Sequence, residues 1–235
     1  MKKIMFSERY GLEQAVLAGT KTQTRRIIPD IEIDWNRRGR VTLPVSGFEH
    51  GVLFMDVRSI LHDAGICDYS APAKYQPKYE VGEEVAIAQS YRDLIEQGYL
   101  CRESDGWVSE KYCTSPGYRN KMFVKADFMP HRIRITNIKV DRLQDISEED
   151  AMREGVLKAP FDGYHVTGIG MTVPKSMARP IGLTADGKPV YGDRYRDFKY
   201  DTPREAFAAL IDRISGRGTW KSNPWVYAYT FELIK

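Results

Sequence analysis

The chain has 235 residues, of which 42% are hydrophobic and 29% charged, and 35 basic against 32 acidic side chains give a net charge of +3. This composition is typical of a folded globular domain and excludes disorder throughout the chain. No apolar run approaches the ~20 residues of a transmembrane helix, and no apolar segment follows the basic N-terminus as in a secretory signal. We therefore expect a cytoplasmic protein.

The cysteines and histidines show no spacing that is typical of metal or redox sites. Cys67, Cys101 and Cys113 form no C-x-x-C motif, so reduced thiols are expected. The four histidines form no H-x-x-x-H pair, so no metal site is predicted. The glycine motifs that bind phosphates or dinucleotides are also missing from the sequence, and no cofactor is predicted.

The first third of the chain predicts one strand and one helix. Residues 2–6 favour a short strand, and residues 11–18 favour a helix that ends at Gly19. A dense polar turn is expected at 20–26. Residues 30–78 contain no long periodic element, and we interpret them as an insertion in a single domain.

The middle of the chain favours buried strands. Residues 85–88 form a short apolar run that predicts a buried strand. Residues 92–122 are polar with scattered aromatic side chains, which suggests a hairpin or another excursion, and we interpret them as a second insertion. Residues 123–143 are strand-like, and their apolar alternation reverses near Asn137. That reversal predicts a β-bulge or a sharp bend.

A short helix and a long loop are expected next. Ser147 is predicted to cap a helix over 148–154 that stops at Gly155. Six glycines and four prolines fall within 158–200, a composition that favours a loop or flap. This third insertion is assigned to the same domain.

The C-terminal part carries the clearest periodic signals. Thr202–Glu205 has the residues of a helix start, and the i, i+3, i+4, i+7 stripe of Phe207, Leu210, Ile211 and Ile214 follows. Alternation over 226–233 predicts a strand. Residues 1–235 are therefore predicted to form one α+β domain, a small mixed or antiparallel β-barrel with flanking helices, enlarged by loop insertions.

Positive charge is concentrated in the turn after the first helix. Lys21, Arg25 and Arg26 lie within six positions with no acid between them, and threonines are interleaved with them. Such a turn suits an anionic or carbonyl-rich ligand, because arginine offers forked donors and lysine a point charge. The alternative is a solvated basic turn favoured by the dipole of the preceding helix. Composition alone favours that alternative.

Three segments together resemble one family. Residues 19–26, Gly-Thr-Lys-Thr-Gln-Thr-Arg-Arg, resemble the signature of the ASCH domain, which belongs to the PUA-like superfamily. Residues 132–156 are similar to its phage and prophage branch, in which a strand, a Leu-Gln-Asp-Ile turn and an Asp-Ala-x-x-Glu-Gly helix follow in order. Residues 218–227 resemble the closing Trp…Asn-Pro-Trp-Val strand of that branch.

The resemblance implies both a fold and a class of ligand. It implies a small PUA-like β-barrel with a cleft where the lysine turn meets the helix that carries Glu154. PUA-like barrels commonly bind RNA or modified bases, so the expected partner is a modified nucleoside or a nucleic acid, RNA before DNA. Some small ASCH proteins are amidohydrolases that remove acetyl from N4-acetylcytidine with a lysine, a threonine and a glutamate. The matching positions are Lys21, Thr24 and Glu154.

The chemistry of these three residues also follows from their side chains. Amide hydrolysis needs a nucleophile, a base and a donor for the oxyanion. Thr24 offers a hydroxyl, and Lys21 becomes a base where burial or the neighbouring arginines lower its pKa. An acid at a helix C-terminus is unfavourable, so Glu154 is expected to pair with Lys21 or Arg26. The non-catalytic alternatives are that Thr24 caps the backbone of the turn and that Glu154 is a solvated acid at a helix end.

One segment departs from the pattern of the family. Phage-type members carry an Arg-Glu pair and a tryptophan where this chain has Ala88-Gln89-Ser90-Tyr91. A charged contact to a base is thereby lost, and Tyr91 retains only stacking. Tyr91 and Trp220 are candidates for stacking on a base, with core packing as the alternative. The remaining candidate substrate contacts are Thr22, Arg25 and Arg26.

Two functions of different classes follow from the sequence. One is hydrolysis of an acylated nucleoside at Lys21, Thr24 and Glu154. The other is non-catalytic binding of RNA or DNA through the basic turn, the glycine- and proline-rich flap and a basic cluster at 37–40. The three candidate catalytic residues favour the hydrolase, whereas the large insertions suggest a bigger ligand.

Overall fold

The computed structural model describes residues 1–29, 77–100, 110–158, 163–166 and 200–234, with backbone segments at 31–35, 39–43, 47–49, 52–54, 182–184, 186–187 and 189–190. Most of the predicted insertions at 30–78 and 158–200 lies outside the described residues, as do Arg37, Arg38 and the side chain of Arg40. The described segments pair as short antiparallel hairpins: β3 (Ile31–Trp35) with β4 (Gly39–Leu43), β5 (Gly47–Glu49) with β6 (Val52–Phe54), β9 (Leu157–Lys158) with β10 (Tyr164–His165), and β11 (Gly182–Leu183) with β12 (Pro189–Val190).

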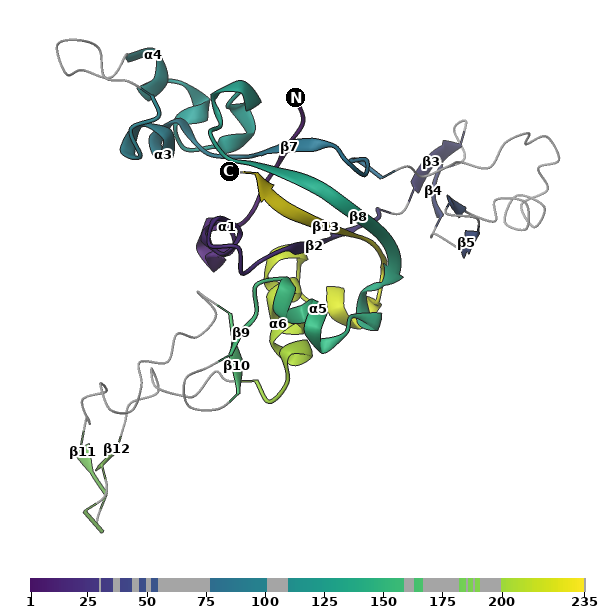
Figure 1. Cartoon of the computed structure of the whole chain (residues 1–235). Helices are drawn as coiled ribbons and strands as arrows, with labels where there is room; N and C mark the ends of the chain where they lie inside the picture. Colours follow the sequence, from purple (N-terminus) through teal and green to yellow (C-terminus); the bar gives the residue numbers. More distant parts are fainter. Residues whose placement is uncertain are drawn as a thin grey trace.

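A five-stranded mixed sheet forms the centre of the molecule (Figure 1). Its strands, in spatial order, are β1 (Lys3–Ile4), β7 (Glu84–Ile87), β8 (Arg132–Arg142), β13 (Trp225–Ile234) and β2 (Gln23–Ile27). β1 and β7 are parallel, and the other neighbours are antiparallel. The predicted α+β class is confirmed. Among the described strands, β1 and β2 stay unpaired edges, so the sheet curves without closing into a barrel.

The predicted bulge is confirmed on β8. Thr230 of β13 pairs with Asn137, and the next residue, Phe231, pairs with Ile135. Thr136 is therefore the extra residue of the ladder, next to the position where the apolar alternation reverses. The bulge lets one long strand turn its apolar residues to the core on both sides of the bend.

Two local predictions were wrong about backbone conformation. The polar turn expected at 20–26 is a strand from Gln23 onward, because β2 pairs with β13 with Thr24 opposite Tyr229. The segment 123–131 is not a strand but contains two 3₁₀ helices, η3 (Lys121–Phe123) and η4 (Ala126–Phe128). For β2, pairing with β13 decided the conformation over local composition.

Helices cover the sheet and supply much of the core. They are η1 (Glu8–Tyr10), α1 (Leu12–Leu17), η5 (Leu143–Asp145), α5 (Glu148–Arg153), α6 (Pro203–Ser215) and α7 (Thr219–Ser222). The predicted caps are confirmed: Ser147 accepts a hydrogen bond from the Asp150 amide, and Thr202 forms a capping box with Glu205. Figure 1 shows α5 and α6 side by side, and Phe207 and Leu210 of α6 belong to the main core.

A second, smaller apolar cluster lies on the other side of β7. Side chains alternate along that strand, so Val85 and Ile87 join the main core while Ala86 and Ala88 join the second cluster. The cluster is covered by α3 (Tyr91–Glu96), α4 (Glu110–Cys113) and η2 (Pro116–Tyr118). The described part of the predicted insertion at 92–122 is thus helical, not a hairpin.

None of the helices in the described parts of the chain has the length and apolar character needed to cross a bilayer; the longest, α6, has 13 residues.

Candidate functional site

The junction between α1 and β2 positions Lys21. Gly19 takes a positive φ of 74°, and the amides of Thr20 and Lys21 both donate to the Ala15 carbonyl. The chain then turns into β2, and the Thr22 amide donates to the Arg153 carbonyl at the end of α5. These bonds bring the Lys21 side chain to the C-terminal end of α5.

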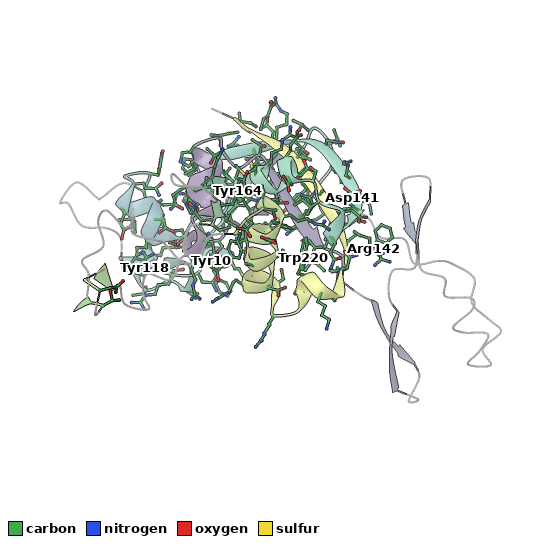
Figure 2. All side chains as sticks on the ribbon, turned by 90° about the horizontal axis from the view of Figure 1, so that it is seen from below. Tyr10, Tyr118, Asp141, Arg142, Tyr164 and Trp220 are labelled. Carbon is green, nitrogen blue, oxygen red and sulfur yellow. The ribbon has the colours of Figure 1, made fainter. Side chains whose placement is uncertain are left out.

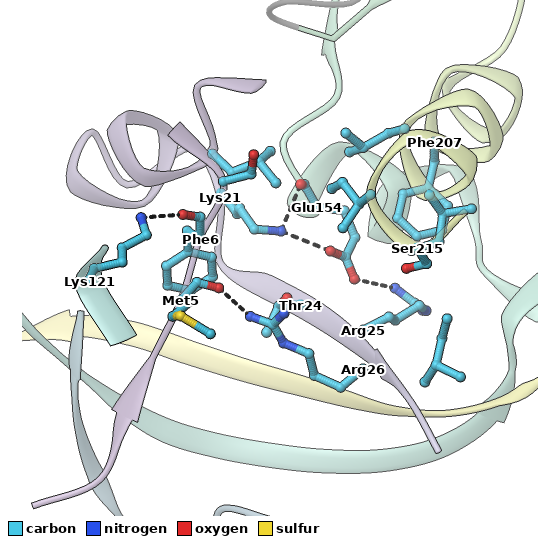
Figure 3. Close-up of a pocket in the computed structure, with 16 residues that line it drawn as sticks. Met5, Phe6, Lys21, Thr24, Arg25, Arg26, Lys121, Glu154, Phe207 and Ser215 are labelled. Carbon is cyan, nitrogen blue, oxygen red and sulfur yellow. Dashed lines mark hydrogen bonds and ion pairs between the residues drawn. The ribbon is translucent and has the colours of Figure 1, made fainter. Parts of the chain in front are cut away.

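A cavity of about 460 Å³ opens between β2, α6, the segment that follows β1 and the C-terminal end of α5 (Figure 3). This volume is within the range of small-molecule sites. Sixteen residues line the cavity, and they include all three predicted catalytic residues: Met5, Phe6, Ser7, Leu12, Lys21, Thr24, Arg25, Arg26, Ile27, Lys121, Glu154, Phe207, Leu210, Ile211, Ile214 and Ser215. The cavity therefore combines the two motifs that the sequence places 130 residues apart.

Lys21 and Glu154 form a buried ion pair at the centre of the cavity. Nζ of Lys21 lies 2.8 Å from Oε2 of Glu154, and the two side chains are 2% and 4% exposed. The ammonium also donates to the carbonyls of Glu154 and Gln23, each at 2.7 Å. Burial lowers the pKa of Lys21 below its ordinary value, the nearby guanidinium groups of Arg26 and Arg25 lower it further, and Glu154 opposes the shift.

Gly155 permits the close approach of these two residues. It follows Glu154 at the end of α5 with a φ of 102°, which favours glycine. A Cβ at this position would lie 3.0 Å from Cδ2 of Leu12 and 3.6 Å from Cδ of Lys21. The predicted stop at Gly155 thus lets α5 end directly against α1 and the lysine.

Arg25 is a structural partner of the ion pair. Its guanidinium donates to Oε1 of Glu154 at 3.2 Å, to Oδ2 of Asp150 at 3.2 Å and to Oε1 of Gln23 at 2.7 Å. The side chain is 1% exposed. Glu154 was predicted to pair with Lys21 or Arg26, and the pair with Lys21 is present. The second cation bound to Glu154 is Arg25 and not Arg26. Arg25 thus orients Glu154.

Thr24 and Arg26 line the cavity with few bonds of their own. Thr24 is 5% exposed, and among the described residues no hydrogen bond joins it to Lys21. Arg26 reaches from β2 to the other edge of the sheet, where Nη2 donates to the Met5 carbonyl at 2.6 Å. Its guanidinium lies 6.0 Å from the ring centre of Phe6. These two residues present a hydroxyl and guanidinium donors to the cavity (Figure 3).

The other three predicted contact residues are not among the residues that line the cavity. Thr22 uses its backbone to extend the sheet, accepting from the Phe231 amide. Tyr91 is 8% exposed and packs in the second cluster against Tyr112.

Trp220 packs edge-on against Phe207, at 6.2 Å between ring centres, with the Arg204 guanidinium over its face at 5.6 Å. Tyr118, in the segment that covers the second cluster, and Trp220 lie on opposite sides of α6 in Figure 2. The two aromatic candidates therefore belong to different apolar clusters, Tyr91 to the second cluster and Trp220 to the main core.

The cavity also contains residues that the sequence analysis missed. Lys121 of η3 donates to the Phe6 carbonyl at 2.7 Å and pairs with Glu8 at 2.8 Å and Glu13 at 3.1 Å. Burial raises the pKa of Glu13, and Lys121 opposes that shift. Nothing in the local sequence marks Lys121, because its partners lie more than 100 positions earlier. The apolar stripe of α6 was predicted as core, and its role as a cavity wall had no sequence signal.

Comparison with known proteins gave no match: no protein-family model, no curated protein and no solved structure is significantly similar to this chain.

Within the described ranges, no group of three His, Cys, Asp or Glu side chains is placed to hold a metal ion.

Proposed function

We propose that this chain is an ASCH-type protein of the PUA-like superfamily and that its cavity binds and hydrolyses a small acylated amide of the N4-acylcytidine kind. One observation carries the proposal: Lys21, Thr24 and Glu154, separated by up to 133 positions, line a single cavity, with the lysine and the glutamate in a buried ion pair. Buried ionisable groups with shifted pKa values in a cavity are typical of catalytic sites.

Each of the three residues has a distinct role in the proposed reaction. The Thr24 hydroxyl attacks the amide carbonyl carbon, and its proton passes to the neutral amine of Lys21, which must turn from its present acceptors toward Thr24 in the substrate complex. Lys21 becomes neutral by giving a proton to Glu154, with which it is in hydrogen-bond contact at 2.8 Å. A low Lys21 pKa favours this transfer, because burial disfavours the charged amine.

Arg26 is the proposed donor to the developing oxyanion. Within the described residues, its guanidinium donates one hydrogen bond, to the Met5 carbonyl. Its other N–H groups are the proposed donors to the ligand. The C–N bond then breaks, and the leaving amine takes the proton from Lys21. Water hydrolyses the ester left on Thr24, which releases the acid and restores the hydroxyl.

The shape of the sheet is compatible with a PUA-like barrel. Five strands curve around one core, and the two edge strands approach each other closely enough for Arg26 of β2 to bond with Met5, which directly follows β1. The cavity lies at this seam. In the proposed PUA-like fold, this side-chain bond joins two edges between which the described strands form no backbone ladder.

The positions of the cations favour a small ligand over a nucleic-acid strand. Arg25 and Lys121 are bound to acidic side chains inside the protein, and Lys21 is 2% exposed. A phosphate backbone needs cations that reach solvent, because its affinity comes from the release of counterions. The cations described in the cavity therefore favour the hydrolase, and the side chains of the basic cluster at 37–40 lie outside the described residues.

The two candidate functions are tested by one pair of measurements on the purified chain. Incubation with N4-acetylcytidine should release cytidine, and filter binding of single-stranded RNA at increasing salt should show no strong affinity at low salt. The absence of cytidine, together with tight binding whose logarithm falls steeply with the logarithm of the salt concentration, would favour the binding module over the hydrolase.

A further inference from the structure

The cavity has two chemically different sides. Thr24, Arg26 and the Lys21–Glu154 pair contribute polar groups from β2 and from the C-terminal end of α5. The other side is formed by α6, whose apolar face contributes a continuous stripe: Phe207, Leu210, Ile211 and Ile214. Side chains at this i, i+3, i+4, i+7 spacing project from one face of a helix. A ligand that fills the cavity therefore contacts polar groups and an extended apolar wall at once.

The apolar side chains of the cavity extend beyond those that pack in the main core. Phe207 and Leu210 are 1% and 2% exposed and are packed in the main core. Ile214, one turn further along α6, still lines the cavity but is 41% exposed. Met5 lines the cavity from the β1 side and is also 41% exposed. Packing within the protein leaves these two apolar side chains partly uncovered.

Single exposed apolar side chains are common on protein surfaces, but Ile214 and Met5 line the same cavity. Each of the two exposed side chains has polar neighbours in sequence, Ser215 after Ile214 and Ser7 two residues after Met5, and both serines line the same cavity. The entrance therefore combines apolar side chains with small polar ones. This pattern suits a ligand whose apolar end lies at the entrance of the cavity, next to solvent.

We propose that the α6 wall receives the acyl group of the substrate and that the protein prefers amides whose acyl group is longer than acetyl. This inference rests on the proposed function and specifies its substrate class. The amide group would lie at Lys21, Thr24 and Glu154, and the acyl chain would run along Leu210 and Ile211 toward Ile214. An acetyl group, with a single methyl, would leave most of this wall without contact.

The apolar contact has a measurable size. Burial of one methylene contributes about 0.8 kcal/mol, so each added methylene should raise kcat/KM about fourfold while the chain remains inside the cavity. The rise should stop once the acyl chain passes Ile214 and Met5 and reaches solvent. Two added methylenes, from acetyl to butanoyl, should give roughly a 15-fold increase.

The test measures kcat/KM of the full chain for N4-acetyl-, N4-butanoyl- and N4-hexanoylcytidine, together with their equilibrium affinities by calorimetry in the Thr24→Val variant. The wild-type values should rise with chain length. In Ile214→Asn, which places a polar amide on the wall, the rise should be reduced several-fold. Val81→Asn is the matched control: Val81 is 63% exposed and does not line the cavity, so the rise should persist.

The outcomes separate this inference from the proposed function. Hydrolysis at a rate that is independent of acyl length, or that falls with it, would overturn the acyl wall and leave the hydrolase intact. No hydrolysis, but affinity that rises with acyl length and is weakened by Ile214→Asn, would overturn the hydrolase and support the wall. Neither hydrolysis nor binding of any of the three compounds would overturn both.

Discussion

Lys21 is buried, and a buried lysine side chain in a folded protein needs partners for its charge. Its three ammonium donors reach Glu154 twice and the Gln23 carbonyl once, so the charge is fully bonded. The sequence indicated this pair through one unfavourable feature, an acid at the C-terminal end of a helix. Arg26 was the alternative partner, because residues 20–26 were predicted to form a turn.

A strand resolves the roles of the two arginines. Successive side chains of a strand point in opposite directions, so Arg25 turns toward Asp150 and Glu154 while Arg26 turns toward Met5. Their positions in the sequence alone could not distinguish the two, since both are cations in one basic run. The structure buries Arg25 against Asp150 and Glu154 and leaves Arg26 in the lining of the cavity.

The buried arginine should contribute much more to stability than an exposed one that contacts the same acid. Arg25→Met removes a guanidinium that is 1% exposed and leaves Glu154 and Asp150 with fewer partners, so it should lower the free energy of unfolding by about 3 kcal/mol. Arg153→Met is the control, because Arg153 is 54% exposed and lies 3.8 Å from Asp150. Its loss should be within about 1 kcal/mol. Urea unfolding measures both; equal losses would contradict the structural role of Arg25.

At the scale of the elements, local signals in the sequence predicted α5 and α6 well. Ser147, Gly155 and the Thr202–Glu205 box specify where these helices begin or end through bonds between near neighbours. The strand β2 was missed because its polar residues carry no apolar alternation. It is a strand because β13 offers it a ladder, and that partner lies about 200 positions further along the chain.

The end of α5 should tolerate no side chain at Gly155. Gly155→Ala introduces a positive φ for alanine, at a cost of about 1–2 kcal/mol, and a contact of 3.0 Å with the buried Leu12. Gly82→Ala is the control, because Gly82 has a φ of 85° but a Cβ added there would meet no atom within 4 Å. Thermal unfolding should show Gly155→Ala as less stable than Gly82→Ala by about 1 kcal/mol or more.

That comparison isolates the close approach from the backbone strain that both glycines share. Equal stability of the two alanine variants would mean that α1 and α5 are not held as closely as the structure has them. A selective loss at Gly155 would show that the approach of α5 to α1, and with it the Lys21–Glu154 contact, constrains this position.

At the scale of the whole molecule, the sequence predicted the α+β class and the strands β1, β7, β8 and β13, but neither β2 nor the arrangement of the sheet. The edges β1 and β2 meet across the bond between Arg26 and Met5, and the cavity forms where this seam faces α5 and α6. Such a site depends on contacts between residues far apart in the chain. Only the resemblance to the ASCH pattern linked Lys21, Thr24 and Glu154 before the structure did.

Long-range packing also decides the surroundings of the two aromatic candidates. Tyr91 and Trp220 were selected because aromatic rings stack on bases, with core packing as the alternative, and in the structure both rings contact other aromatic side chains. Their residue types fit either role, and only their surroundings decide. The opposite holds for Lys121: nothing in the sequence marks it as a site residue, and yet it lines the cavity.

Thr24 is the proposed nucleophile in a cavity shared with Lys21 and Glu154, and turnover of N4-acetylcytidine by Thr24→Val is the decisive measurement. Valine keeps the volume of threonine and removes only the hydroxyl, so cytidine release should fall by about 10³-fold or more while the fold is retained. Thr20→Val is the matched control, because Thr20 is exposed and its hydroxyl donates only to the Ala15 carbonyl; it should retain wild-type turnover. Undiminished turnover by Thr24→Val would rule out Thr24 as the nucleophile.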